Sequence, residues 1–151
     1  MTRVLALLVA LTASFAVAAP VPKGVKKKEA SLEGDWKLEA EERDGKPGQR
    51  TGTHNLWRVT DGQMTLIAEN NPQGQKKEYP TALVTAPVDG TSLRTFDYTV
   101  LENKYQRNGV CELDGDTLKI AFGKTPTTRP DKLTSENGGY LYTFKRVQPD
   151  R

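Results

Sequence analysis

The stretch GVCELDGDTLKIAF, residues 109–122, shows the pattern on which the fold prediction depends. Apolar and polar side chains alternate on both sides of Asp114-Gly115, and Asp-Gly supplies the positive φ angles that a tight hairpin turn requires. If these two residues form the turn, Cys111 faces Leu118 and both side chains lie on the apolar face. The stretch therefore predicts two antiparallel strands with one buried face.

The same stretch combines three carboxylates with the only cysteine, a composition that could also indicate a metal or catalytic site. In the hairpin register Glu112 points to the polar face, Asp114 lies in the turn, and Asp116 stands at the rim beside Leu113, so the carboxylates diverge. A calcium loop needs them to converge on one oxygen cage. A thiol buried among aliphatic side chains is inert. We therefore predict a scaffold hairpin with Cys111 in the core and no metal site.

Turn signals of this kind recur along the chain, and each favours antiparallel pairing of the strands that flank it. Between them lie short runs rich in Thr, Val, Tyr, Trp and Leu, without a sustained helical period. The turn signals are Asp44-Gly45, Asp61-Gly62, Asp89-Gly90, Asp114-Gly115 and Asn137-Gly138-Gly139.

Eight strands follow from these turns, and one face of each alternating run is apolar. In the first, Trp36, Leu38 and Ala40 are expected inside, opposite a polar face that includes Glu41. Eight hairpin-linked strands in one small domain favour an all-β, lipocalin-like up-and-down barrel, with a two-sheet β-sandwich as the alternative. The expected strands are residues 34–42, 55–60, 63–69, 76–84, 92–101, 104–113, 116–122 and 140–147.

The N-terminus has the layout of a secretory signal peptide: Arg3, an uncharged apolar stretch over residues 4–17, and then small residues. The apolar stretch is shorter than the about 20 residues that a bilayer span needs. We therefore expect an exported protein, periplasmic or extracellular, with no integral membrane span after cleavage. The expected organisation is a signal peptide at 1–19, a Pro- and Lys-rich linker at 20–30, the barrel at 31–147 and a C-terminal tail at 148–151.

The charge balance excludes some partners. The chain has 22 basic and 19 acidic residues, but four of the lysines lie in the linker. Arg3 lies in the expected signal peptide, so from Glu29 onward 17 basic residues are balanced against 19 acidic ones, a net charge of −2. A near-neutral body without a basic patch argues against binding to nucleic acid. A single cysteine allows no disulfide within the chain, so the core must provide the stability.

Catalytic motifs are absent from the sequence. His54 is the only histidine, so Cys–His chemistry has a single possible pair, and we interpret His54 as a surface or strand-end residue. There is no nucleophile elbow, no metal-ligand spacing of Cys and His, and no Gly-rich phosphate loop. We therefore expect a non-catalytic protein, with no catalytic residue, no metal ligand and no cofactor.

Two features are compatible with ligand binding. Arg107 shares strand parity with Tyr105 and Cys111, so its guanidinium could point inward and meet a carboxylate or phosphate. Alternatively, a bulge at Asn108-Gly109 could turn Arg107 out to solvent. Several aromatic residues could line a cavity or simply fill the barrel: Trp57, Tyr79, Phe96, Tyr98 and Tyr142. The candidate ligand-binding residues are Trp57, Tyr98, Tyr105, Arg107 and Tyr142.

Gly34-Asp35-Trp36, together with Lys145-Arg146, resembles the lipocalin arrangement, in which a Trp closes one barrel end under a late Arg. A longer pattern is more specific and spans nearly all of residues 31–147. It resembles an uncharacterised family of exported, lipocalin-like domains found mostly in planctomycetes. The pattern consists of LEGDWKLEAEERDGK (32–46), CELDGDTLKIAF (111–122), Arg129-Pro130 and YLYTFKR (140–146).

The resemblance implies a β-barrel and no established activity. It also implies that Trp36 stacks on Arg146 and that both, with Gly34, close one end of the barrel as structural residues. The chain departs from the family at Cys111, where an aromatic residue is common, and at Ala121, near which the family often has a cysteine.

Two functions are expected from these features. The first is an exported, non-catalytic barrel that binds a small apolar or amphipathic ligand in its mouth. The alternative is an envelope interaction or structural module, with a filled barrel that binds protein or polysaccharide through its loops. A cavity inside the barrel discriminates between them. The sequence leaves the oligomeric state open.

Overall fold

A computed structural model describes residues 31–48, 54–69 and 75–148, and within these ranges all regular structure is strand. The predicted signal peptide and linker, and residues 149–151 of the tail, lie outside the described residues. No helix in the described ranges is long and apolar enough to span a membrane. The strands are β1 (Gly34–Arg43), β2 (Lys46–Pro47), β3 (Leu56–Thr60), β4 (Gln63–Ala68), β5 (Lys77–Val84), β6 (Arg94–Val100), β7 (Gln106–Asp114), β8 (Thr117–Phe122) and β9 (Tyr140–Arg146).

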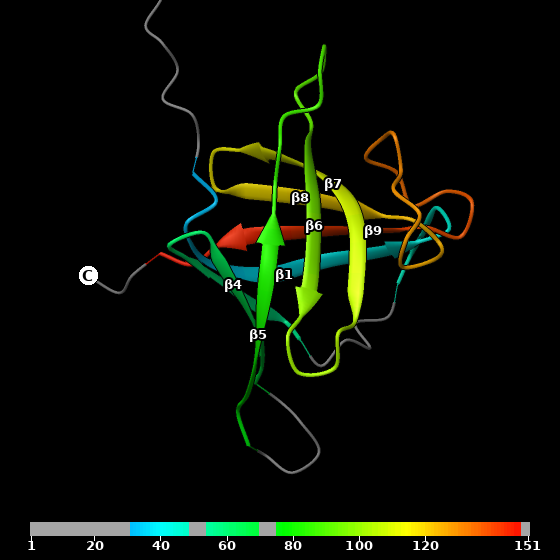
Figure 1. The fold of residues 1–151 in the computed structure, drawn as a ribbon. Coiled ribbons are helices and arrows are strands. Elements are labelled where there is room, and N and C mark those ends of the chain that lie inside the picture. The colour runs from blue at the N-terminus through cyan, green and yellow to red at the C-terminus, as the bar shows by residue number, and fades with distance from the viewer. Residues whose placement is uncertain (1–30, 49–53, 70–74, 149–151) are drawn as a thin grey trace, which may run out of the picture.

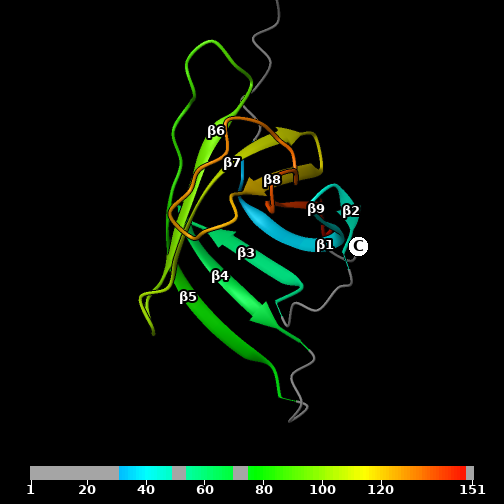
Figure 2. The ribbon, with the colours of Figure 1, turned by 90° about the vertical axis from the view of Figure 1, so that its right-hand side faces the viewer.

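The strands form one antiparallel sheet that closes on itself (Figures 1 and 2). Each strand from β3 to β8 pairs with the next in sequence, β1 pairs with β3, and β9 returns to pair with β1. The predicted eight-stranded up-and-down barrel is therefore confirmed, and closure excludes the two-sheet sandwich. The short β2 is an additional ninth strand beside β1.

Two of the predicted turns form as expected. Asp44-Gly45 connects β1 to β2 and Asp61-Gly62 connects β3 to β4. The φ angles are 51° and 72° in the first turn and 53° and 72° in the second. Two central residues with positive φ are the requirement of a two-residue type I′ hairpin, which explains why Asp-Gly occurs at both places.

The pairing register of β7 and β8 differs from the prediction by two residues, and the turn lies one residue later in the chain. Asp114 pairs with Thr117, so the central residues are Gly115 and Asp116, and Cys111 faces Ile120. Only Gly115 has a positive φ, 57°, as in a type II′ turn, which takes glycine at its first central position. Because side chains alternate with a period of two, the shift leaves every side chain on the expected face.

One end of the barrel is closed by a stack of Arg146 on Trp36, which are directly paired between β9 and β1. The guanidinium carbon lies 4.1 Å from the ring centre. Trp36 Nε1 donates to the Leu32 carbonyl at 2.7 Å, and Arg146 Nη2 donates to the Ser31 carbonyl at 2.8 Å. Gly34 has φ 120°, and a Cβ there would lie 2.9 Å from Arg146 Nη1. The three residues therefore make the closing contacts that the resemblance implies.

A pocket of about 330 Å³, lined in part by Leu32, Val59, Leu83 and Arg94, also opens at this end. The other inward side chains of this half have essentially no exposed surface, and together they supply the apolar burial that stabilises a chain without disulfides. They include Trp36, Met64, Phe96, Cys111, Leu118, Ile120 and Phe144.

A β-bulge in β1 changes which residues face the interior. Leu38 pairs with Phe144 but Ala40 pairs with Thr143, so Glu39 is an extra residue in the strand. Before the bulge Trp36 and Leu38 point inward, and after it Glu41 and Arg43 do, while Ala40 is exposed. The expectation that Ala40 lies inside and Glu41 outside was therefore wrong, because one inserted residue reverses the faces.

Candidate functional site

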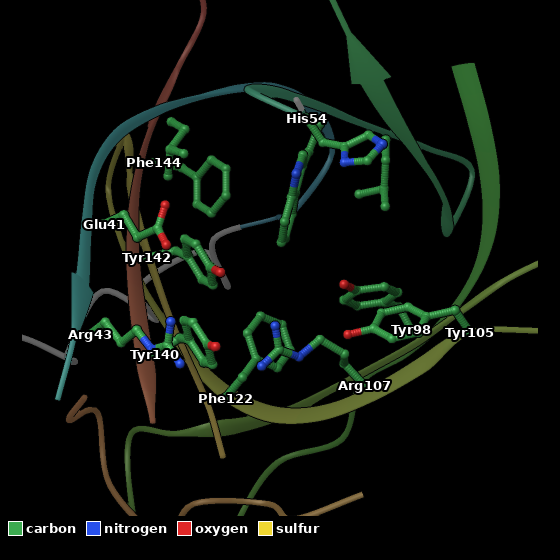
Figure 3. Close-up of a pocket in the computed structure, with 13 residues that line it drawn as sticks. Glu41, Arg43, His54, Tyr98, Tyr105, Arg107, Phe122, Tyr140, Tyr142 and Phe144 are labelled. Atoms are coloured by element: carbon green, nitrogen blue, oxygen red, sulfur yellow. The ribbon is translucent and has the colours of Figure 1, made fainter. Parts of the chain in front are cut away.

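The end of the barrel opposite the Trp36–Arg146 stack holds a cavity of about 380 Å³ (Figure 3). Residues from seven of the nine strands and from two connecting segments line it, so the cavity is a feature of the whole barrel end. The lining residues are Leu38, Glu41, Arg43, His54, Trp57, Leu66, Tyr98, Tyr105, Arg107, Phe122, Tyr140, Tyr142 and Phe144.

All five sequence-predicted binding candidates line this cavity: Trp57, Tyr98, Tyr105, Arg107 and Tyr142. The other two aromatic candidates do not. Phe96 is completely buried and packs against Trp57, with ring centres 5.9 Å apart, and Tyr79 packs edge-on against His54. The aromatic residues therefore fill one half of the barrel and line the hollow in the other.

Arg107 points into the cavity (Figure 3). The β6–β7 register runs without interruption through Asn108 and Gly109, so the alternative bulge does not form there. The guanidinium carbon lies 4.7 Å from the ring centres of both Phe122 and Tyr140. Nη2 donates to the Gly123 carbonyl at 3.3 Å, whereas Nε is buried and has no partner among the described residues.

Gly109 allows Phe122 to take its place in the cavity wall. The two residues face each other across β7 and β8. A Cβ at residue 109 would lie 2.6 Å from the Ala121 carbonyl oxygen and 2.7 Å from Phe122 Cδ1. Only glycine therefore leaves room for the ring on which Arg107 stacks.

Trp57 provides a second polar group in the wall. Its side chain is 6% exposed and packs on Phe144, with ring centres 4.3 Å apart. Its Nε1 is buried and has no hydrogen-bond partner within the described ranges. Because buried indole N–H groups normally have an acceptor, Trp57 contributes an unsatisfied donor to the cavity wall.

Glu41 and Arg43 enter the cavity wall because of the β1 bulge. Burial raises the pKa of the Glu41 carboxyl above its usual value, although the charges of Arg43 and Arg107 oppose the shift. The Arg43 guanidinium carbon lies 5.2 Å from the Tyr140 ring centre, which places it over the same ring as Arg107. The structure thus adds to the wall a carboxyl that the sequence pattern had placed outside, together with a second guanidinium.

Burial favours the uncharged form of three further groups in the cavity, His54, Tyr98 and Tyr142. Burial lowers the pKa of His54, and the nearby Lys77 charge lowers it further. Burial raises the pKa of Tyr142 to about 12 and shifts the pKa of Tyr98 above its usual range. His54, interpreted as a surface or strand-end residue, precedes β3 and lines the cavity, for which a lone histidine in the sequence gives no signal.

Cys111 has no exposed surface and does not line the cavity, as its predicted core position requires. Burial raises the pKa of its thiol to about 12, although the Arg94 charge lowers it in part. Because only the thiolate is nucleophilic, the thiol should not react with Ellman's reagent at pH 8 over an hour, and should react fully in 6 M guanidinium chloride. Rapid reaction of the native protein would contradict this burial.

Two of the three carboxylates of the β7–β8 hairpin make separate contacts. Ser92 donates to Glu112, and Arg146 Nε donates to Asp116 Oδ1 at 3.0 Å. Among the described residues, no group of three or more His, Cys, Asp and Glu side chains is placed to hold a metal ion.

The fold and the cavity together define a class of protein: a closed eight-stranded up-and-down β-barrel with one packed end and one hollow, aromatic-lined end. No protein-family model matches the chain, and no curated protein matches it.

Proposed function

We propose that this protein is an exported, non-catalytic barrel that binds a small amphipathic molecule in its hollow end. The observation that carries the proposal is a cavity of about 380 Å³ with aromatic walls and an unsatisfied Trp57 N–H donor in its wall. Ligand pockets commonly have this character, largely apolar with a few placed polar groups. Export is proposed from the N-terminal sequence alone.

The cavity favours ligand binding over the alternative of a filled envelope module. A filled barrel would have no internal volume to spare and would act through its loops. Here the side chains of Trp57, Tyr98 and Tyr142 line the cavity and do not fill it. An apolar body in that hollow would replace water against these rings, which is the favourable term in binding.

The proposal predicts that the purified protein binds N-phenyl-1-naphthylamine, a neutral probe that fluoresces in apolar surroundings, with one molecule per barrel. Leu66→Phe should weaken binding by about tenfold, because the larger side chain enters the cavity. Fluorescence titration measures both effects. Leu101→Phe is the matched control, since Leu101 is exposed and does not line the cavity.

Thermal unfolding of both variants would confirm that they are folded under the titration conditions. No rise in fluorescence up to the solubility limit, with this probe or with its sulfonated analogue, would refute the proposal. An equal loss of binding in the Leu101→Phe control would do so too, because binding would then not depend on the cavity.

A further inference from the structure

We infer that the hollow end selects an anion: a compact aromatic acid whose charged oxygens lie between Arg43 and Arg107 and whose ring lies against the aromatic wall. This inference rests on the proposed function and names the class of ligand for the same cavity. It concerns the chemistry of the polar group, which the cavity volume alone does not specify.

The first argument is charge balance. Two guanidinium groups, those of Arg43 and Arg107, lie over the one ring of Tyr140, with their carbons 5.2 Å and 4.7 Å from its centre. Among the described residues, Glu41 is the only acidic one that lines the cavity. Neither arginine forms an ion pair with a carboxylate among the described residues. The site therefore has a positive excess, and like charges held together in a partly desolvated place favour an anion between them.

The second argument is the kind of hydrogen-bonding group on offer. Arg107 Nε and Trp57 Nε1 are both buried, and both lack a partner within the described residues. Guanidinium and indole nitrogens are donors only, so the complementary ligand must bring acceptors. A carboxylate or sulfonate brings two or three oxygens, and a guanidinium binds such a group through two parallel hydrogen bonds.

The third argument is the shape of the apolar part. Aromatic rings from β3, β8 and β9 form the wall: Trp57, Phe122, Tyr142 and Phe144. Their ring centres lie 4.3 to 6.3 Å from a neighbouring ring, the spacing at which aromatic groups interact edge-to-face or offset. The cavity volume is near the lower limit for ligand sites. A compact aromatic body fits these walls better than a long flexible chain does.

The test compares two probes with the same ring skeleton. 8-Anilino-1-naphthalenesulfonate is N-phenyl-1-naphthylamine with an added sulfonate, so the difference between their affinities reports the anion alone. We expect the sulfonate probe to bind about tenfold to hundredfold more tightly at low salt, the range for a charge-assisted contact. Fluorescence titration of the purified protein gives both dissociation constants.

The variants assign the effect to named groups. Arg107→Gln should weaken binding of the sulfonate probe by about tenfold or more and change that of the neutral probe by less than about twofold. Arg43→Gln, at an exposed position on the rim, should have the same pattern with a smaller loss. Glu41→Gln removes the opposing charge and should tighten sulfonate binding by roughly twofold to fivefold.

Arg58→Gln is the matched control, because Arg58 lies outside the cavity in an exposed ion pair with Asp35. It should leave the affinities of both probes unchanged. Equal loss of sulfonate binding in Arg58→Gln and Arg107→Gln would overturn the inference, since the effect would then be one of overall charge.

Competition against the bound sulfonate probe defines the ligand further. We expect 2-naphthoate to displace it at concentrations at least about tenfold lower than 2-naphthamide or decanoate do. Displacement by decanoate at the same concentration as 2-naphthoate would overturn the aromatic part and indicate a chain acid. Equal affinities of the wild-type protein for the two fluorescent probes would overturn the anion inference while the proposed function stands. Binding of neither probe would overturn the proposed function itself.

Discussion

Replacing Trp36 with alanine should lower the free energy of unfolding by about 3–5 kcal/mol, the range for removing a completely buried tryptophan. The indole closes the packed end of the barrel, so its removal leaves a void that the paired strands cannot collapse to fill. It also removes the ring under Arg146 and the hydrogen bond to the Leu32 carbonyl. Urea denaturation followed by circular dichroism measures the change.

Leu101→Ala is the control for this prediction, because Leu101 is 48% exposed and should change the free energy of unfolding by no more than about 0.5 kcal/mol. Trp36 does not line the cavity, so probe affinity should persist wherever the variant is folded. A loss of less than about 1 kcal/mol in Trp36→Ala would show that the stacked end is not what stabilises the barrel.

Gly109→Ala should lower the free energy of unfolding by about 2–3 kcal/mol, as expected for overpacking against groups that cannot retreat. The added methyl would meet the Ala121 carbonyl oxygen at 2.6 Å, and that oxygen belongs to the paired β8 backbone. It would also meet the Phe122 ring, which must move. Because Arg107 stacks on that ring, the affinity for the sulfonate probe should fall together with the stability.

A double variant separates the two contacts. Phe122→Leu removes the ring but leaves the carbonyl, so Gly109→Ala should cost less in that background, with a coupling energy of about 1 kcal/mol. Gly115→Ala is the contrasting control. Its Cβ would meet nothing within 4 Å, so its cost of about 1–2 kcal/mol comes only from the positive φ. Additive effects of Gly109→Ala and Phe122→Leu would contradict the clash with the Phe122 ring and assign the cost to the Ala121 carbonyl oxygen.

The strand order and most of the interior could be predicted because local chemistry determines them. Asp44-Gly45 and Asp61-Gly62 occur where two consecutive positive φ angles are needed, and few other dipeptides provide them. The alternation of Leu118, Ile120 and Phe122, and of Tyr140, Tyr142 and Phe144, gave the correct inward faces. Parity alone did not decide the position of Arg107, because a bulge at Asn108-Gly109 could have turned it to solvent, and the uninterrupted β6–β7 register is what places it inside.

The inward positions of Glu41 and Arg43 could not be predicted, because the β1 bulge has no signal in the sequence. Residues 38–41, LEAE, alternate apolar and acidic without interruption, so they read as an ordinary strand with its acids outside. The pairing of Leu38 with Phe144 and of Ala40 with Thr143 is set by neighbouring strands and by closure of the barrel. Local periodicity contains no information on that long-range constraint.

The two-residue error in the predicted β7–β8 pairing register has a related cause. The sequence DGD around Gly115 permits a turn centred on residues 114–115 or on residues 115–116, and both place one glycine at a central position. Pairing along the whole strand, which continues to Gly109 and Phe122, selects the second. Because the register error is an even number of residues, it does not change which side chains face the interior.

The bulge at Glu39 also divides the evolutionary constraints on β1 into two parts. Substitutions before the bulge are constrained by the packing of the closed end. Substitutions after it are constrained by the ligand of the hollow end. Loss of the Glu39 codon would remove the bulge but leave Ala40 paired with Thr143, so Glu41 and Arg43 would keep their inward positions. A one-residue deletion at the bulge would therefore leave both the lining of the hollow end and the packed core as they are.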